Sequence, residues 1–141
     1  MIRAVIDTNV LVSALLSPAG NEALLLLAIR NRLVAPSFTE EIIEEYTDVL
    51  TRPKFNFPRS QVNDVIALFR ESGQLVQPAE TKIASPDPAD TKFLQCAVAG
   101  LADFIVTGNK RHFPASPYES AYVVSAGELL SQISLNIPPF S

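Results

Sequence analysis

Short apolar runs of strand character alternate with segments of helical periodicity along nearly the whole chain. Runs rich in Val, Ile, Leu and Phe predict strands at residues 3–6, 33–35, 75–76, 104–107 and 122–124. Between them, apolar side chains recur at helical spacing in residues 9–16, 21–31, 39–51, 62–69, 90–99 and from 125 onward. This alternation predicts an α/β fold, with helices on both faces of a central parallel sheet, because parallel neighbours need long crossover connections.

Several predicted helix boundaries carry residues that start or stop helices. Ser37-Phe38-Thr39-Glu40 and Ser125-Ala126-Gly127-Glu128 have the spacing of a capping box. Asp87-Pro88-Ala89-Asp90 has the form of a helix start with Pro at its first position. Gly73 and Gly100 stand where helices are expected to end.

The composition is that of one packed globular unit. The chain has 141 residues, of which 48% are hydrophobic, and no repeat or linker divides it, so residues 1–141 are predicted to form a single domain. The single cysteine, Cys96, excludes an internal disulfide and a cysteine-based zinc site. The apolar run 23–29 is too short to cross a bilayer. Since the N-terminus also lacks the features of a signal peptide, we expect a cytoplasmic protein with no membrane partner.

The net charge of −4 constrains any role in nucleic-acid binding, since such proteins usually carry a basic stripe. A divalent metal would make the negative charge compatible with a nucleic-acid substrate by neutralising several carboxylates. Alternatively, basic residues would act locally, as at Arg52-Pro53-Lys54 and Lys110-Arg111-His112. An acidic enzyme with a small-molecule substrate is the remaining alternative.

Asp7 is a carboxylate placed where the first predicted strand ends, directly after Val5 and Ile6. Ligands of open parallel sheets gather outside the carboxyl ends of the strands. A buried acid without a partner costs folding free energy. Asp7 is therefore expected to be paired, hydrogen-bonded or holding a cation.

Two further acids lie toward the apolar side of their helices. Asp90 falls on the stripe that continues with Phe93 and Leu94; the alternative is a carboxylate satisfied by the free N–H groups of a helix start. Glu45 lies at the edge of a stripe centred near Tyr46, whereas the other acids of that helix are expected on its solvated face.

Asn109 is a fourth polar candidate, two residues past the predicted strand 104–107. A doubly wound topology would bring this strand end beside the one that carries Asp7. Its amide oxygen would then coordinate a metal or a water, or Gly108-Asn109 would simply form a turn.

Three carboxylates in one cleft would repel and raise one another's pKa values. Mg²⁺ or Mn²⁺ with oxygen ligands removes this conflict. Such a site suits phosphodiester hydrolysis, because the metal activates water, neutralises phosphate charge and stabilises the leaving oxygen. No set of histidines or cysteines competes; His112, the only histidine, is expected at the surface or on a phosphate, and Cys96 is expected to be inert.

Three segments in a fixed order carry a family resemblance: DTNVLVSA at 7–14, EEYTDVLTRPKF at 44–55, and DPAD at 87–90 followed by ADFIVTGN at 102–109. In these segments the chain resembles the PIN-domain family, and within it the VapC-like toxins of bacterial and archaeal toxin–antitoxin pairs. The resemblance covers nearly the whole chain. It implies a Rossmann-like α/β/α sandwich with a central parallel sheet and a Mg²⁺- or Mn²⁺-dependent ribonuclease site.

The resemblance also assigns residues to this site. The metal-binding acids of the family map to Asp7, Glu45 and Asp90, and a further family aspartate is replaced here by Asn109, for which Asp87 or Asp103 is available to compensate. The residues implied to support the site or the substrate are Asn9, Ser13, Thr107, Arg52, Lys54, Lys110 and Arg111. For Ser13, a packing or backbone hydrogen-bonding role is the alternative. The four basic residues would hold flanking phosphates of RNA, or be plain surface charges.

The resemblance implies partners as well. These are an RNA substrate, an antitoxin peptide that occludes the cleft, and a second copy in a homodimer, with the 21–31 run as a candidate contact and core packing as its default role. Two rival functions remain. One is a haloacid-dehalogenase-like phosphotransfer enzyme with Asp7 as nucleophile, although the usual second acid is Asn9 here. The other is a non-catalytic PIN-like module that binds RNA or protein.

Overall fold

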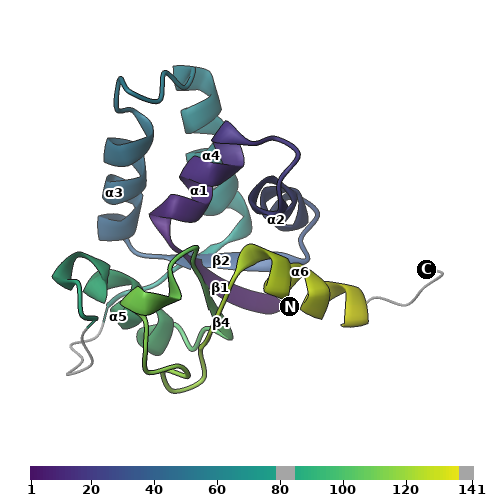
Figure 1. Cartoon of the computed structure of the whole chain (residues 1–141), viewed down its shortest axis with the longest axis vertical. Helices are drawn as coiled ribbons and strands as arrows, with labels where there is room; N and C mark the ends of the chain where they lie inside the picture. Colours follow the sequence, from purple (N-terminus) through teal and green to yellow (C-terminus); the bar gives the residue numbers. More distant parts are fainter. Residues whose placement is uncertain (79–84, 137–141) are drawn as a thin grey trace.

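The computed structural model describes residues 1–78 and 85–136. Its centre is a sheet of five parallel strands in the order β3-β2-β1-β4-β5 (Figure 1). The strands are β1 (Ile2–Ile6), β2 (Val34–Phe38), β3 (Gln74–Leu75), β4 (Phe104–Val106) and β5 (Tyr122–Val124). The chain builds β2 and β3 on one side of β1 and then returns to place β4 and β5 on the other. The strand order therefore reverses between β1 and β4, which is where open α/β sheets bind ligands.

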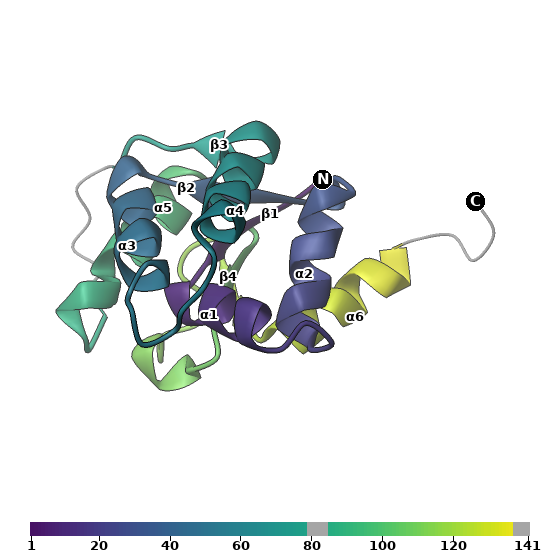
Figure 2. The same ribbon diagram turned by 90° about the horizontal axis from the view of Figure 1, so that it is seen from above.

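Helices cover both faces of this sheet, as the alternating pattern predicts. The helices are α1 (Thr8–Leu16), α2 (Asn21–Arg30), α3 (Glu40–Leu50), α4 (Arg59–Ser72), α5 (Thr91–Ala99) and α6 (Ala126–Asn136), with short 3₁₀ turns η1 (Pro88–Asp90) and η2 (Lys110–His112). Figure 1 shows α1, α3 and α4 on one side of the sheet and α5 on the other. Helix α6 lies beside α2 (Figure 2). The result is a three-layer α/β arrangement.

Strand β2 is longer than its apolar run suggests. The expected strand was 33–35, but pairing continues through Pro36 to Phe38 because β2 lies between two strands, with Val5 opposite Ser37 on one side and Gln74 opposite it on the other. Pro36 has no N–H to donate, so local sequence argues against a strand there. Pairing with both neighbours overrides that preference.

The two predicted capping boxes had different outcomes. At the start of α3 the prediction was wrong: Thr39 caps the helix by accepting the Ile42 N–H at 3.1 Å, and Ser37 is buried inside β2. At the start of α6 the box is formed in both directions. The Ser125 N–H donates to Glu128 at 2.9 Å and the Glu128 N–H donates to the Ser125 hydroxyl at 3.1 Å.

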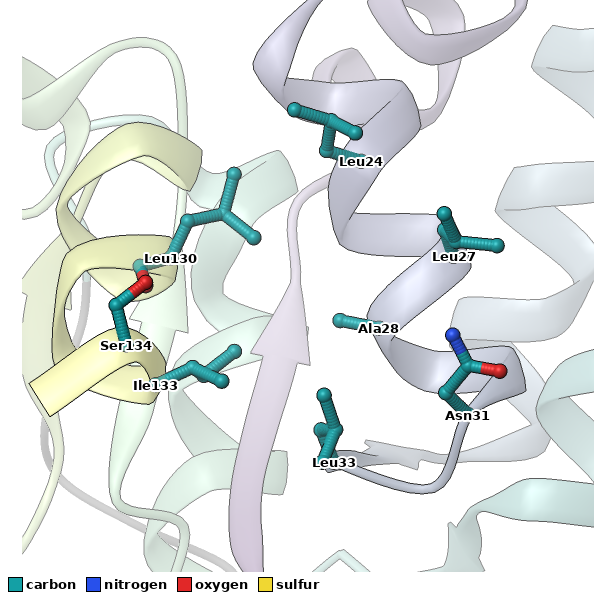
Figure 3. Close-up of a pocket in the computed structure, with 8 residues that line it drawn as sticks. All are labelled: Leu24, Leu27, Ala28, Asn31, Leu33, Leu130, Ile133 and Ser134. Carbon is teal, nitrogen blue, oxygen red and sulfur yellow. The ribbon is translucent and has the colours of Figure 1, made fainter. Parts of the chain in front are cut away.

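Helix α2 divides the 21–31 apolar run between the core and the surface. Leu25 and Ile29 are fully buried, whereas Leu24 and Leu27 are 47% and 50% exposed. These two leucines line an apolar hollow of about 290 Å³ between α2 and α6 (Figure 3). No single helix among the described residues has the length and apolar character needed to cross a membrane; α1 and α2 meet that test only as a pair, and they are bent by 104° at their junction.

Tyr46 of α3 ties the helical layer to the end of β1. Its side chain is fully buried and its hydroxyl donates a hydrogen bond to the carbonyl of Ile6. The ring packs edge-to-face on Phe69 with centroids 5.5 Å apart. Burial raises the pKa of Tyr46 well above its ordinary value, so the hydroxyl keeps its proton. The residue before Asp7 is thus held by a donor in the core.

We expect Tyr46→Phe to lower the free energy of unfolding by about 1–2 kcal/mol, because the Ile6 carbonyl loses a buried donor. Urea denaturation measures the change. Tyr122→Phe is the matched control, since Tyr122 is 56% exposed. Equal stability of the two variants would show that the Tyr46 hydroxyl contributes nothing to the fold.

Candidate active site

Asp7 and Thr107 directly follow the neighbouring strands β1 and β4, at the point where the strand order reverses. The Thr107 hydroxyl donates to Oδ2 of Asp7 at 2.8 Å, and the Asp7 N–H donates to the Val106 carbonyl at 2.9 Å. Asp7 is 3% exposed and Thr107 is 1% exposed. The carboxylate is therefore held in one orientation at the edge of the sheet.

Burial raises the pKa of Asp7 above its ordinary value, and the nearby carboxylate of Glu45 raises it further. The hydrogen bond from Thr107 acts in the opposite direction, because it stabilises the charged form. Desolvation has the larger effect, so an ionised Asp7 is destabilising in the protein alone. A cation at this carboxylate would remove the penalty.

Asp7 opens into a cleft of about 410 Å³ that gathers acids from three regions of the chain. Glu45 enters from α3, and Asp87 and Asp90 enter from η1. All three acids selected from the sequence thus line the same cleft. Its wall also includes Asn9, Arg52, Lys54, Phe55 and His112.

Glu45 has two partners that sequence reasoning missed. The Thr8 hydroxyl donates to its carboxylate, and the ammonium of Lys92 lies 2.7 Å from Oε1. Lys92 stands in the first turn of α5, where the helix dipole favours acids over cations. That unfavourable position was a signal in the sequence for a nearby acid.

His112 lines the cleft and is partly exposed there, and a contact with phosphate stays a prediction. Its Nδ1 is 2.7 Å from Oδ2 of Asp90, and its Nε2 is 3.0 Å from the amide nitrogen of Asn109. The amide oxygen of Asn109 accepts the Arg111 N–H at 3.3 Å, so the amide nitrogen of Asn109 is the atom that faces the imidazole of His112. Since an amide nitrogen only donates, Nε2 accepts and the imidazole proton on Nδ1 faces Asp90.

Asp90 is 8% exposed, and burial raises its pKa, with a further increase from the charge of Asp7. His112 opposes this shift. Oδ2 of Asp90 is shielded from water. Its one polar contact among the described residues is with Nδ1 of His112 at 2.7 Å, and no other donor reaches it. A buried carboxylate oxygen of this kind is available to a cation.

Ligand atoms of Asp87, Asp90 and His112 all lie within 4.8 Å of one another. Asp87 also caps η1, accepting the Ala89 N–H at 3.0 Å as its sequence pattern predicts. Asp7 and Glu45 line the same cleft outside this tight group. Because carboxylate oxygens dominate the set, the residues fit a hard divalent cation such as Mg²⁺ or Mn²⁺. His112 would add a nitrogen ligand only by giving up its contact with Asp90 or with Asn109.

For Asn109 and Ser13 the sequence leaves two roles open, a ligand-facing one and, respectively, a turn at Gly108-Asn109 and a packing or backbone hydrogen-bonding role. Neither is among the described residues that line the cleft. The oxygen of Asn109 caps η2, so its nitrogen faces His112. Ser13 is half-buried on α1, and its carbonyl accepts the Ser17 N–H where the helix ends.

The expected basic residues separate into two pairs. Arg52 and Lys54 line the cleft, and Arg52 pairs with Asp48 at 3.1 Å. Lys110 forms an ion pair with Glu128 of α6, and Arg111 is exposed outside the set of described residues that line the cleft.

Asp103 cannot compensate for Asn109, which corrects one expectation. It precedes β4, at the strand end opposite the cleft, and its carboxylate accepts the Arg3 N–H at 2.9 Å. Asp87 is the alternative that the fold brings into the cleft. The two differ because a parallel sheet separates the two ends of every strand.

Comparison with known proteins is consistent with this geometry. The model of one family, described as the PIN domain, matches residues 3–111, which is well over half of the chain. No curated protein and no solved structure gave a significant match. The matched range holds β1 from its second residue, β2, β3, β4 and every acid of the cleft. The chain therefore belongs to the PIN-domain family, whose members are generally metal-dependent nucleases.

Proposed function

We propose that this protein is a metal-dependent endoribonuclease, the VapC-like toxin of a type II toxin–antitoxin pair, and that it hydrolyses RNA phosphodiester bonds. One observation carries the proposal: Asp7, Glu45 and Asp90, from three distant segments, line one cleft in a chain of a nuclease family. Their mutual repulsion at a buried sheet edge is what a divalent cation relieves.

Asp7, Glu45 and Asp90 are the proposed ligands of Mg²⁺ or Mn²⁺, directly or through water, with Asp87 and His112 close enough to share in the coordination. When bound, the cation would lower the pKa of a water and offset the charge of the scissile phosphate. The protein's own contribution is to hold these carboxylates in place before substrate arrives.

The neighbouring side chains perform this positioning. Thr107 fixes Asp7, and Thr8 with Lys92 fixes Glu45. Lys92 also reduces the negative charge that an incoming phosphate would meet. Asn109 keeps a place in the proposed site in a supporting role, because its contact with His112 orients the ring that faces Asp90.

RNA is the proposed substrate although the chain carries a net charge of −4. Arg52 and Lys54 line the cleft and supply local positive charge for flanking phosphates. Lys110 and Arg111 lie outside the cleft wall, where they would contact RNA only beyond the cleavage position. Asn9, which is exposed in the cleft, is available to the substrate or to a water.

The toxin role adds two proposed partners. An antitoxin peptide would occlude the acidic cleft, which also holds the cations Arg52 and Lys54. A second copy would form a homodimer, and the exposed leucines of the 21–31 run, Leu24 and Leu27, are open to such a contact. The proposed location of the protein is the cytoplasm.

The test is an RNA cleavage assay of the purified protein with Mg²⁺, with Mn²⁺ and with EDTA. We expect cleavage with either metal and none in EDTA, because the ligand set is built from carboxylates. Cleavage that persists in EDTA would refute the proposed site. RNA binding without cleavage under any metal would favour the non-catalytic module, and a trapped aspartyl-phosphate on Asp7 would favour phosphotransfer.

A further inference from the structure

Two aromatic rings are stacked in the segment that follows α3. The rings of Phe55 and Phe57 lie 5.3 Å apart between centroids, with only 7° between their planes. Phe57 is partly buried and packs against the core. Phe55 is also half-buried, but it lines the acidic cleft together with Asp7 and Asp90. The core thus supports one ring, and that ring supports a second at the wall of the cleft.

Packing alone does not account for an aromatic residue at position 55. Phe55 does not belong to the partly buried side chains that pack on the core, whereas its neighbour Phe57 does. An apolar ring in the wall of a cleft with four carboxylates exposes hydrophobic surface among charges. An aromatic side chain that lines a cleft together with polar groups is typical of a ligand-binding site.

One cation lies over this ring and a second lines the same cleft. The ammonium of Lys54 lies 5.0 Å from the centroid of Phe55, and Arg52 lines the same cleft with its guanidinium pairing with Asp48 on the surface. An aromatic face beside basic side chains is how proteins hold single-stranded nucleic acid, with bases on the rings and phosphates on the cations. A duplex keeps its bases stacked on one another and has no free face to offer.

We propose that Phe55 is the residue on which one base of a single-stranded RNA stacks, with Phe57 as its support and Lys54 and Arg52 on adjacent phosphates. This inference rests on the proposed nuclease function, and it adds the residue that positions the strand. Because Phe55 and the acids share one cleft, the stacked base lies close to the bond that is cut. Lys54 covers the ring in the free protein, and its flexible chain moves to a phosphate when the base arrives.

The first measurement is the affinity for a short unstructured oligoribonucleotide, by fluorescence anisotropy at low ionic strength in EDTA, which prevents cleavage. We expect Phe55→Leu to weaken binding about tenfold, the order expected for one lost base–aromatic stack. Phe55→Tyr keeps a ring and is expected to bind as the wild type does. Binding of the same sequence as a duplex is expected to change in neither variant.

Tyr122→Leu is the matched control, since it removes an exposed ring at the strand end opposite the cleft. It is expected to leave RNA affinity unchanged. Thermal unfolding of each variant shows that the protein remains folded.

The second measurement separates stacking from a general structural effect. In a series of oligonucleotides with one abasic nucleotide at successive positions, we expect a single position to weaken wild-type binding about tenfold. The same abasic position is expected to cost Phe55→Leu nothing further. Lys54→Ala, by contrast, is expected to lower the slope of log affinity against log salt by about one, because it removes a phosphate contact.

Unchanged affinity in Phe55→Leu, equal losses in Phe55→Leu and Phe55→Tyr, or an abasic penalty that persists in Phe55→Leu would each overturn the inference. The two proposals fail separately. Metal-dependent cleavage with no effect of Phe55 on binding leaves the nuclease intact and removes the stacking residue. A stacked base in a protein that cleaves no RNA with any metal leaves Phe55 and removes the nuclease.

Discussion

Asp7→Asn is expected to lower kcat/KM for RNA cleavage by at least about a hundredfold, since it removes a charge that the metal site requires. The substitution is nearly isosteric, and the amide oxygen of Asn can still accept the hydrogen bond from Thr107. A loss of activity would therefore report on charge and not on shape. Initial rates on a labelled RNA with Mn²⁺ measure the effect, and Asp90→Asn is expected to behave in the same way.

Asp64→Asn is the matched control for this experiment. It makes the same chemical change at an exposed position of α4, outside the cleft. Its rate is expected to equal that of the wild type, and the loss of activity in Asp7→Asn purified in the same way excludes a contaminating nuclease as the source. A wild-type rate in both Asp7→Asn and Asp90→Asn would contradict the proposed ligand set.

The second large effect is that added metal reverses which of two proteins, the wild type or Asp7→Asn, is the more stable to heat. At a free metal concentration one hundred times Kd, the wild type is expected to gain about 2.7 kcal/mol of stability. Asp7→Asn is expected to gain much less, because one ligand has lost its charge. In EDTA we expect the opposite order, with Asp7→Asn unfolding roughly 4 °C above the wild type for each kcal/mol of repulsion that it relieves.

The pH dependence in EDTA follows from the raised pKa of Asp7, which burial and Glu45 produce. Between the unfolded pKa, about 4, and the higher folded pKa, the native state binds more protons than the unfolded state. The wild type therefore loses stability relative to Asp7→Asn as pH rises through this window. Below about pH 4 the difference is expected to be smallest, because the wild-type carboxyl is then protonated in both states.

Thermal unfolding monitored by circular dichroism tests both expectations: the effect of metal by comparing samples with and without Mn²⁺, and the effect of pH by repeating the EDTA samples across this pH range. Asp64→Asn serves again as the control and is expected to follow the wild type. If Asp7→Asn proves less stable than the wild type in EDTA at neutral pH, then the ionised carboxylate is stabilised by contacts within the protein and needs no cation.

Much of the architecture could be predicted from the spacing of apolar residues alone. The strands at 3–6, 104–107 and 122–124 correspond closely to β1, β4 and β5. Apolar spacing also located the helices, because one face of each must pack on the sheet. The capping box of Ser125 and Glu128 could also be predicted, because its partners are three residues apart and need no distant contact.

Local signals were less reliable where a long-range contact outweighed them. Strand β2 extends through Pro36 because β1 and β3 pair with it on both sides. Asp103 and Asp87 were alternatives that the sequence left open, and Asp103 is the nearer to Asn109 along the chain, yet of the two only Asp87 lines the cleft. Direction along a strand decides between them, and that direction has meaning only once the sheet has formed.

The parallel sheet, the covering helices and the choice of Asp7, Glu45 and Asp90 as candidates could be predicted from the sequence, because each depends on the position of a residue relative to its own apolar stripe or strand end. The contacts that hold these acids emerge only in the folded protein: Lys92 against Glu45, and His112 between Asp90 and Asn109. These contacts join separate elements, whose approach depends on the packing of the whole core. The position of Lys92 at a helix start signals that an acid lies nearby, but it does not identify Glu45.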